Sequence, residues 1–195
     1  RLGFLQVRPM VVSGELVEIT SGELEQENLF VASDRVMGNG VIENIHDIVY
    51  VKPESFEAKW TRRIASELER INASLVSDHR IYVLIGFGRW GSSDPWLGIP
   101  VEWGQICAAR VIVEATLPAM NTEPSQGSHF FHNITAFRIG YLSVHHDRRP
   151  GIDWEWLAEQ PAVEETELVR HVKLTDPLLV KLDGRTGLGG IWHRR

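Results

Sequence analysis

The sequence predicts a mixed α/β domain, and three observations carry that prediction. The run Ile81-Tyr82-Val83-Leu84-Ile85 is apolar throughout and ends in glycines, which is typical of a strand buried near the centre of a sheet. Apolar residues at Trp60, Ile64 and Leu68 have the four-residue spacing of an amphipathic helix. Further short apolar stretches, separated by turn residues, predict additional strands on both sides of these two segments.

Strands and one clear helix are expected in the first half of the chain. Pro53-Glu54 is a typical helix opening, and the apolar spacing that follows predicts a helix from there to Ile71. Gly38-Asn39-Gly40 can adopt the positive φ values of a tight hairpin, so we expect the flanking strands to pair there. Apolar stretches predict strands at residues 4–12, 29–33, 36–37 and 48–51.

Shorter elements are expected in the second half. A long loop with four glycines, residues 86–100, follows the buried strand. Asp153 is a suitable N-cap for a short helix, and Asp183-Gly184 predicts a tight turn between the last two strands. We expect helices at residues 104–109, 127–137 and 154–159. We expect strands at residues 110–114, 139–144, 168–173, 178–182 and 188–192.

The composition excludes several classes of protein. The 195 residues are 43% hydrophobic and 24% charged, a balance typical of a globular chain and not of a disordered one. A formal net charge of −6 without long basic runs offers no electrostatic footprint for nucleic acid or an anionic membrane surface. No apolar run reaches the roughly 20 residues of a membrane-spanning helix. We therefore expect no nucleic-acid partner and no membrane partner.

Cysteine usage and the first residues suggest where the protein works and how it is organised. The single cysteine, Cys107, excludes an internal disulfide and a cysteine-built metal site, which favours the reducing cytoplasm. The chain begins at Arg1, without a methionine, inside a predicted strand. We therefore expect it to be a part of a longer protein.

The segment Gly86-Phe87-Gly88-Arg89-Trp90-Gly91 has the G-x-G-x-x-G spacing of a dinucleotide-binding loop. That motif holds a pyrophosphate at the N-terminus of a helix, and the residues that follow do not favour a helix of useful length. Two other interpretations are open. The glycines can let the loop pass close to Trp90 and Trp96, or Arg89 and the Gly88 amide can contact an anion without a Rossmann unit.

A second motif surrounds two histidines. Gly127-Ser128 suits the start of a helix, which places His129 in the first turn, where free N–H groups and the helix dipole can stabilise an anion. A neutral histidine is also a nucleophile near neutral pH. His129 is therefore the first candidate for a phosphoryl acceptor, and His132, one turn deeper, is the second. The alternative is a capping or buried structural role for both histidines.

Two further patterns have mainly structural interpretations. His129 and His132, or the pair His145-His146, could hold a metal ion, but no acidic partner lies at a diagnostic spacing. Several tryptophans are clustered along the glycine-rich loop, and we expect them to cover it. The cluster consists of Trp90, Trp96 and Trp103.

The opening segment Phe4-Leu5-Gln6-Val7-Arg8-Pro9 resembles the final strand of the ATP-grasp domain in the phosphoenolpyruvate synthase and pyruvate phosphate dikinase family. The resemblance implies that residues 1–20 end such a domain, with Gln6 as a magnesium ligand and Arg8 as a phosphate contact. ATP and magnesium would then bind only together with the ATP-grasp domain upstream of Arg1.

The same family has a swivelling domain whose phosphohistidine lies in a Gly-x-Thr-Ser-His run that opens a helix. Gly127-Ser128-His129 is similar to that run, and the order of the surrounding predicted elements also matches. The resemblance implies that His129 accepts the phosphoryl group. It also implies a linker at residues 21–28, a swivelling-type β/β/α domain with a mixed sheet at residues 29–148, and a C-terminal extension of one helix and short strands at residues 149–195.

The function that the resemblance implies is phosphoryl transfer, in which ATP phosphorylates the histidine and the domain delivers the group to pyruvate at another domain. A detached carrier has no turnover of its own. The chain departs from the family pattern in a longer segment between His129 and Gly140, in Phe130-Phe131, and in residues 86–103. A non-catalytic docking or regulatory module is therefore the alternative, and a nucleotide-binding domain built on residues 86–91 is a third possibility.

Overall fold

The computed structural model describes residues 17–122, 133–134, 136–148 and 151–194. The central strands are β1 (Leu29–Ser33), β2 (Val36–Met37), β3 (Asn39–Val51), β4 (Tyr82–Phe87), β7 (Ala109–Ala115), β8 (Gly140–Val144), β9 (Ala162–Glu165), β10 (Val169–Asp183) and β11 (Leu188–Trp192). A short separate pair is β5 (Arg89–Trp90) and β6 (Gly98–Ile99). The helices are α1 (Ser21–Leu24), α2 (Thr61–Ser77) and α4 (Trp154–Glu159), with 3₁₀ turns at Pro53–Ser55, Ala58–Trp60 and Trp103–Ile106.

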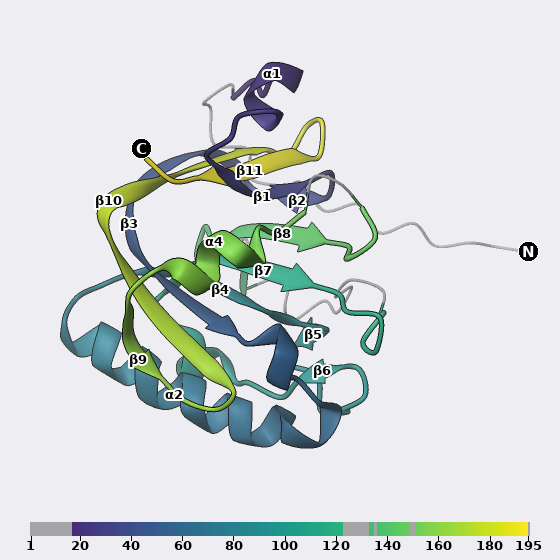
Figure 1. Ribbon diagram of the computed structural model, residues 1–195, viewed down its shortest axis with the longest axis vertical. Helices are drawn as coiled ribbons and strands as arrows, with labels where there is room; N and C mark the ends of the chain where they lie inside the picture. The colour runs from purple at the N-terminus through teal and green to yellow at the C-terminus, as the bar shows by residue number, and fades with distance from the viewer. Residues whose placement is uncertain (1–16, 123–132, 135, 149–150, 195) are drawn as a thin grey trace, which may run out of the picture.

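The described residues form a mixed α/β fold around a nine-stranded sheet. Its order is β1-β11-β10-β3-β4-β7-β8-β2, with β9 paired to β10 (Figure 1). β3, β4, β7 and β8 pair in parallel, whereas the remaining pairs in this sheet are antiparallel. The mixed α/β class predicted from the sequence is therefore confirmed.

The sheet curls until its two ends meet. β1 and β2 lie at opposite ends of the strand order, yet only Asp34 and Arg35 separate them in the chain. Hydrogen bonds cross this join, because Ser33 Oγ donates to the Ser143 carbonyl at 2.6 Å. The Ser143 amide in turn donates to the Arg35 carbonyl at 2.9 Å. The passage from β1 to β2 thus closes the sheet into a barrel-like layer.

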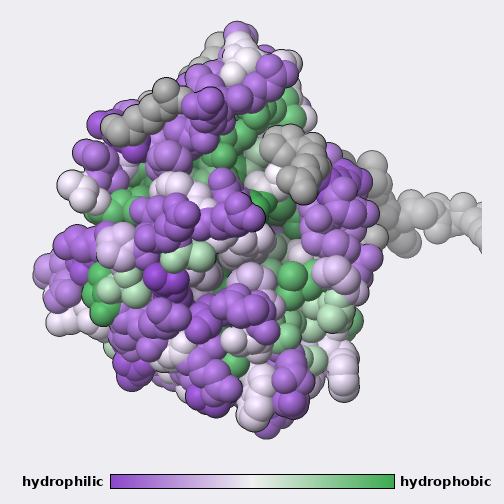
Figure 2. All heavy atoms as spheres, viewed as in Figure 1, coloured by the Kyte–Doolittle hydropathy of each residue, from purple (hydrophilic) through white to green (hydrophobic). Residues whose placement is uncertain are grey.

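Apolar side chains fill both faces of the curled sheet. Ile48 and Tyr50 of β3 belong to the inner core, whereas Val49 and Val51 alternate to the outer face, where they share a second core with α2. β4 is buried at every residue because one core covers each of its faces, as predicted. On the molecular face in Figure 2, hydrophilic side chains dominate, and hydrophobic ones show in the hollows between the elements.

The helix α2 starts later than the sequence predicts. Pro53 opens a 3₁₀ turn, and the chain is extended at Phe56 and Glu57 before α2 begins at Thr61. The extended backbone at Phe56 lets its ring pack on Phe87, with the ring centroids 5.1 Å apart. The prediction of one helix from Pro53 is therefore wrong, because tertiary packing of Phe56 outweighs the local helix signal. None of the helices in the described part of the chain combines the length and apolar character needed to cross a bilayer.

A buried polar network fixes the C-terminal end of α2 to the sheet. Asp47 of β3 is only 2% exposed and accepts hydrogen bonds from the Arg80 guanidinium, with Arg80 Nε at 2.9 Å from Oδ2. His171 of β10, also buried, lies with Nε2 at 2.8 Å from Asp47 Oδ1. Burying a charged group is costly unless it is paired. The network therefore fixes the positions of α2, β3 and β10 relative to one another.

One turn differs from the sequence prediction. Gly38 and Gly40 do have positive φ, at +102° and +140°, but they form a corner and not a hairpin. β2 pairs with β8, whereas β3 pairs with β10 and β4, so the strands on either side of the corner are not partners. The predicted hairpin is therefore wrong, because positive φ permits a sharp turn without selecting the strand that pairs.

The C-terminal strands are a central part of the sheet. The sequence predicts two strands around Pro177, but β10 runs continuously through it, with irregular pairing to β3 between Lys173 and Leu178. β10 and β11 lie between β3 and β1. Residues 169–192 are therefore integral to the sheet that begins at Leu29. Asp153 caps α4 as predicted, since its Oδ1 accepts from the Trp156 amide at 2.9 Å.

Residues 21–28, expected to be a linker, begin with the short helix α1. A capping box closes its first turn, because Thr20 and Glu23 each accept from the other's backbone amide. The Trp192 indole N–H donates to the Glu23 carbonyl at 3.0 Å, and the Glu23 carboxylate accepts from Lys181 Nζ at 2.5 Å. The Lys181 hydrogen bond is the main reason that the pKa of Glu23 is lowered from 4.5 to about 2.

We expect Glu23→Gln to destabilise the protein by about 1 kcal/mol or less at neutral pH, because the pair is partly exposed. Since the pKa of Glu23 is lower in the folded state, the contribution of the carboxylate is complete above pH 4.5 and is lost as the pH falls toward 2. Urea unfolding at several pH values should show the difference between wild type and variant shrinking over that range. Glu25→Gln, at an exposed residue of the same segment, is the control.

We expect Leu68→Ala to lower the free energy of unfolding by about 2 to 5 kcal/mol, because it opens a cavity beneath α2. Leu68 is 1% exposed. Val76→Ala on the same helix, where the side chain is 45% exposed, should change stability by only about 0.5 kcal/mol. Equilibrium urea unfolding of both variants checks the prediction, and equal effects would contradict the assigned face of α2.

Candidate functional site

The carboxyl ends of the parallel strands β4, β7 and β8 lie at one edge of the sheet. In sheets of parallel strands, ligands bind preferentially beyond the carboxyl ends. The glycine-rich loop follows β4, Thr116 follows β7, and His145-His146 follows β8. This edge therefore holds a threonine hydroxyl and two imidazoles, which are groups that can take part in binding or catalysis.

The glycine-rich loop turns back on itself and opens no helix. Gly88 has a φ of +69°, and its amide donates to the Ala115 carbonyl at 3.0 Å. Arg89 and Trp90 then form β5, which pairs with β6. As expected, no helix starts at Gly88. The loop therefore lacks the helix N-terminus on which a dinucleotide fold places the pyrophosphate.

Close packing explains the first two glycines of this loop. A Cβ atom on Gly86 would lie 2.5 Å from the ring of Trp90, and one on Gly88 would lie 2.7 Å from the Leu97 carbonyl oxygen. Trp90 is buried, but Trp96 is 76% exposed. The expectation that the tryptophans cover the loop therefore holds for Trp90 and fails for Trp96.

We expect Gly88→Ala to destabilise the protein by about 1 to 3 kcal/mol, because a side chain at this φ is strained and would meet the Leu97 carbonyl. Gly104→Ala is the matched control, since a Cβ atom there would meet nothing within 4 Å. Thermal unfolding followed by circular dichroism measures both. A smaller loss for Gly88→Ala than for Gly104→Ala would contradict the described loop.

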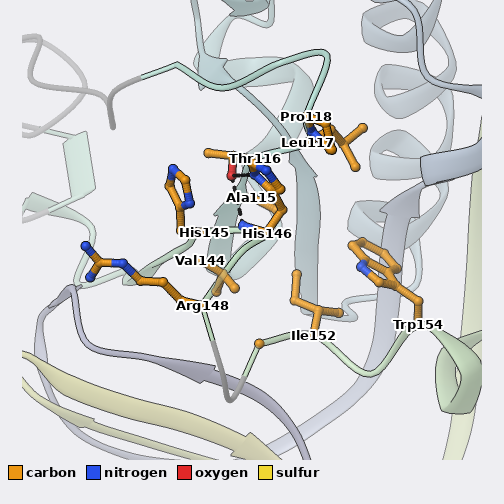
Figure 3. Close-up of a pocket in the computed structure, with 11 residues that line it drawn as sticks. Ala115, Thr116, Leu117, Pro118, Val144, His145, His146, Arg148, Ile152 and Trp154 are labelled. Atoms are coloured by element: carbon orange, nitrogen blue, oxygen red, sulfur yellow. Dashed lines mark hydrogen bonds between the residues drawn. The ribbon is translucent and has the colours of Figure 1, made fainter.

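A pocket of about 330 Å³ opens between the ends of β7 and β8 (Figure 3). Figure 3 shows His145 and Arg148 on one side of this opening and Trp154 on the other. The pocket is lined by Ala115, Thr116, Leu117, Pro118, Val144, His145, His146, Arg148, Gly151, Ile152 and Trp154. No aspartate or glutamate is among these described lining residues, whereas three of the side chains can carry positive charge.

Thr116 positions His146. Its hydroxyl oxygen accepts from the His146 amide at 3.0 Å and lies 2.8 Å from His146 Nδ1. The Thr116 amide donates to the Val144 carbonyl at 3.0 Å, which extends the β7–β8 pairing by one residue. Thr116 is buried, whereas His146 is exposed. A buried side chain therefore holds an imidazole that remains open to ligands.

His145 is held by two oxygen atoms. Its Nδ1 hydrogen-bonds to the Asp147 carboxylate, and its Nε2 lies 2.8 Å from Asn121 Oδ1. The hydrogen bond from His145 keeps the pKa of the Asp147 carboxyl below its ordinary value. The ring of His145 stacks on that of His146, with the centroids 4.9 Å apart. The two imidazoles therefore form one ordered unit.

Arg148 joins this pocket to a second one. Its Nη1 donates to Asp34 Oδ2 at 2.6 Å, and its side chain is half-exposed. A neighbouring cavity of about 250 Å³ shares Val144, His145 and Arg148 with the first, and Asp34 lines it. The Arg148–Asp34 ion pair therefore lies between the two cavities. It connects the segment after β8 to the link between β1 and β2.

The residues predicted from the sequence are only partly within the described structure. Gln6, Arg8, His129 and His132 lie outside the described residues. Gly88 and Arg89 are described, and neither lines the pocket between β7 and β8.

Metal binding was one interpretation of the histidines. In the described segments, no group of three or more histidine, cysteine, aspartate or glutamate side chains is arranged to hold a metal ion. His145 and His146 instead hydrogen-bond to Asp147, Asn121 and Thr116.

The sequence did not single out Thr116 or Arg148 as site residues. Each follows the carboxyl end of a predicted strand, and this signal could have found them. It becomes useful only when β7 and β8 are known to be adjacent and parallel, which requires the pairing of residues far apart in the chain.

Comparisons with known proteins give no family for this chain. No family model matches it, and searches of curated proteins and of solved structures find no match.

Proposed function

We propose that this chain is part of an ATP-dependent phosphotransferase that resembles phosphoenolpyruvate synthase and pyruvate phosphate dikinase. The sheet domain that begins at Leu29, with β10 and β11 as part of it, would form the module that receives and carries the phosphoryl group. His129 is the proposed acceptor, and His132 is the second choice.

One observation supports phosphoryl transfer most directly: basic side chains line the pocket at the carboxyl ends of β7 and β8. In the sequence, Gly127-Ser128-His129 belongs to the connection between β7 and β8. Phosphoryl transfer depends mainly on positioning and on neutralising the charge of the phosphoryl oxygens. Arg148, His145 and His146 supply such groups among the described residues.

The reaction would need domains beyond this module. An imidazole nitrogen of His129 would attack the phosphorus atom, and the bond to the leaving oxygen of the donor would break with its electron pair. ATP and magnesium would bind with Gln6 and Arg8 in an upstream ATP-grasp domain, and pyruvate or phosphoenolpyruvate would bind in another domain. We expect the chain on its own to show no turnover.

A non-catalytic docking or regulatory module is the second candidate. The exposure of two large aromatic side chains favours it, since Trp96 is 76% and Phe137 53% exposed. Exposed aromatic residues are enriched in protein interfaces. In this function the module would dock on the upstream domain without carrying a phosphoryl group.

We expect His129 to react with phosphoramidate at least about tenfold faster than an ordinary exposed histidine, because a carrier imidazole must be a nucleophile. Phosphoramidate transfers its phosphoryl group to an imidazole nitrogen and releases ammonia, so no partner domain is needed. Peptide mass spectrometry at alkaline pH locates the acid-labile phosphate. His79, which is exposed, is the internal reference.

The controls separate the two candidate functions. His129→Ala should remove the fast label, and His132→Ala should leave it. Labelling of His129 at the rate of His79 would contradict the carrier function and favour the docking module. A fast label that persists in His129→Ala but disappears in His132→Ala would move the acceptor to His132.

We also propose that the protein works in the cytoplasm. Cys107 is the single cysteine and is exposed, which suits a compartment that keeps thiols reduced. The net charge of −6 supports small-molecule and protein partners in preference to nucleic acid or an anionic membrane.

A further inference from the structure

The pocket between β7 and β8 has an unusual charge pattern for this protein. The chain as a whole carries a formal net charge of −6, but the described pocket lining contains three basic side chains and no acidic one. The carboxylates that contact these side chains, Asp34 and Asp147, lie outside the lining. The described lining therefore offers nitrogen groups and no carboxylate to a ligand, which suits an oxyanion.

We propose that this pocket binds a small organic oxyanion, a phosphate or carboxylate group on an apolar body, with Arg148 and His146 as its polar contacts. The inference goes beyond the phosphoryl carrier, because it concerns a ligand held by the described residues and stands whether or not His129 is phosphorylated.

One tautomer of His146 can donate a hydrogen bond to a ligand through Nε2. Thr116 Oγ1 already accepts from the His146 amide, so the hydroxyl proton is available for His146 Nδ1 at 2.8 Å. In that arrangement the ring carries its own proton on Nε2. Among the described residues, no side chain or backbone group takes a hydrogen bond from Nε2. An oxyanion can take that bond.

Arg148 can bind a second anion without leaving its first. A guanidinium group has five N–H donors in a planar fork, and the ion pair with Asp34 uses Nη1. The side chain is half-exposed and lines the pocket. Asp34 therefore fixes the guanidinium through Nη1, and the group has further N–H donors for an oxyanion.

The remaining wall is apolar. Leu117, Ile152 and Trp154 line it, and the Trp154 ring packs against Phe87 and Tyr50 with centroid distances of 5.6 and 6.1 Å. The volume of about 330 Å³ lies at the small end of the range for ligand sites. The pocket therefore suits an acid with an apolar part better than a bare inorganic ion.

Amide chemical-shift titrations test this inference. Inorganic phosphate, phenyl phosphate and benzoate are added to the ¹⁵N-labelled chain at constant ionic strength, which removes general charge screening as a variable. We expect saturable shifts at Thr116, Leu117 and His146. We also expect phenyl phosphate to bind at least about fivefold tighter than inorganic phosphate, because its ring buries apolar surface.

Matched variants locate the contacts. Arg148→Ala and His146→Ala should each weaken phenyl phosphate binding about tenfold, since each removes a hydrogen bond to a charged group. Arg148→Lys, which retains the charge, should lose less. Arg70→Ala is the matched control, because Arg70 is also an exposed arginine paired with one carboxylate, Glu164.

Further outcomes keep the inference separate from the carrier function. His129→Ala should bind phenyl phosphate like wild type even though it loses the phosphoramidate label. The inference is overturned if no probe gives saturable shifts, if Arg70→Ala weakens binding as much as Arg148→Ala, or if His129→Ala abolishes binding. Thr116→Val is a second test. It retains all the charges but removes the hydroxyl that positions His146, so it should also weaken phenyl phosphate binding.

Discussion

The closure of the sheet is the constraint on which the rest of the structure depends. β1 and β2 are consecutive in the chain but pair with strands at opposite ends of the sheet, so the sheet must curl to satisfy both. The Ser33 and Ser143 hydrogen bonds fix that join. Closure encloses the inner apolar core and leaves few strand edges unpaired, which limits edge-to-edge association.

Closure also shapes the pocket. It brings Asp34, in the two-residue link between β1 and β2, within hydrogen-bond distance of Arg148 after β8. Parallel pairing of β7 and β8 independently places Thr116 beside His146. The pocket is thus assembled from three segments that are distant in sequence. Its charge pattern arises because carboxylates hold the basic side chains from outside the pocket lining.

Helix α2 depends on the other face of the same sheet. Its apolar side covers β3, β4 and β7, and its C-terminal end is fixed by the buried network of Asp47, Arg80 and His171. Such a network costs desolvation energy and contributes little net stability. Its effect here is geometric, because the partly exposed Arg80, just after α2, pairs with the buried Asp47 of β3.

Local signals predicted several elements well. The apolar run from Ile81 to Ile85 indicated a strand buried on both faces, and Asp153 indicated the start of α4. Local signals failed where a distant partner competes with them. Pro53 signalled a helix, but the chain stays extended so that Phe56 can reach Phe87. Gly38 and Gly40 signalled a hairpin, but the flanking strands have other partners.

The amino-acid sequence was enough to establish the mixed α/β class, the buried central strand and the amphipathic face of α2. These follow from residue periodicity and composition, which act over a few neighbouring positions. The strand order, the central position of β10 and the pocket around Arg148 depend on contacts between residues more than 100 positions apart, such as Arg148 with Asp34. No local pattern encodes such pairs, because their energy is gained only when the sheet closes.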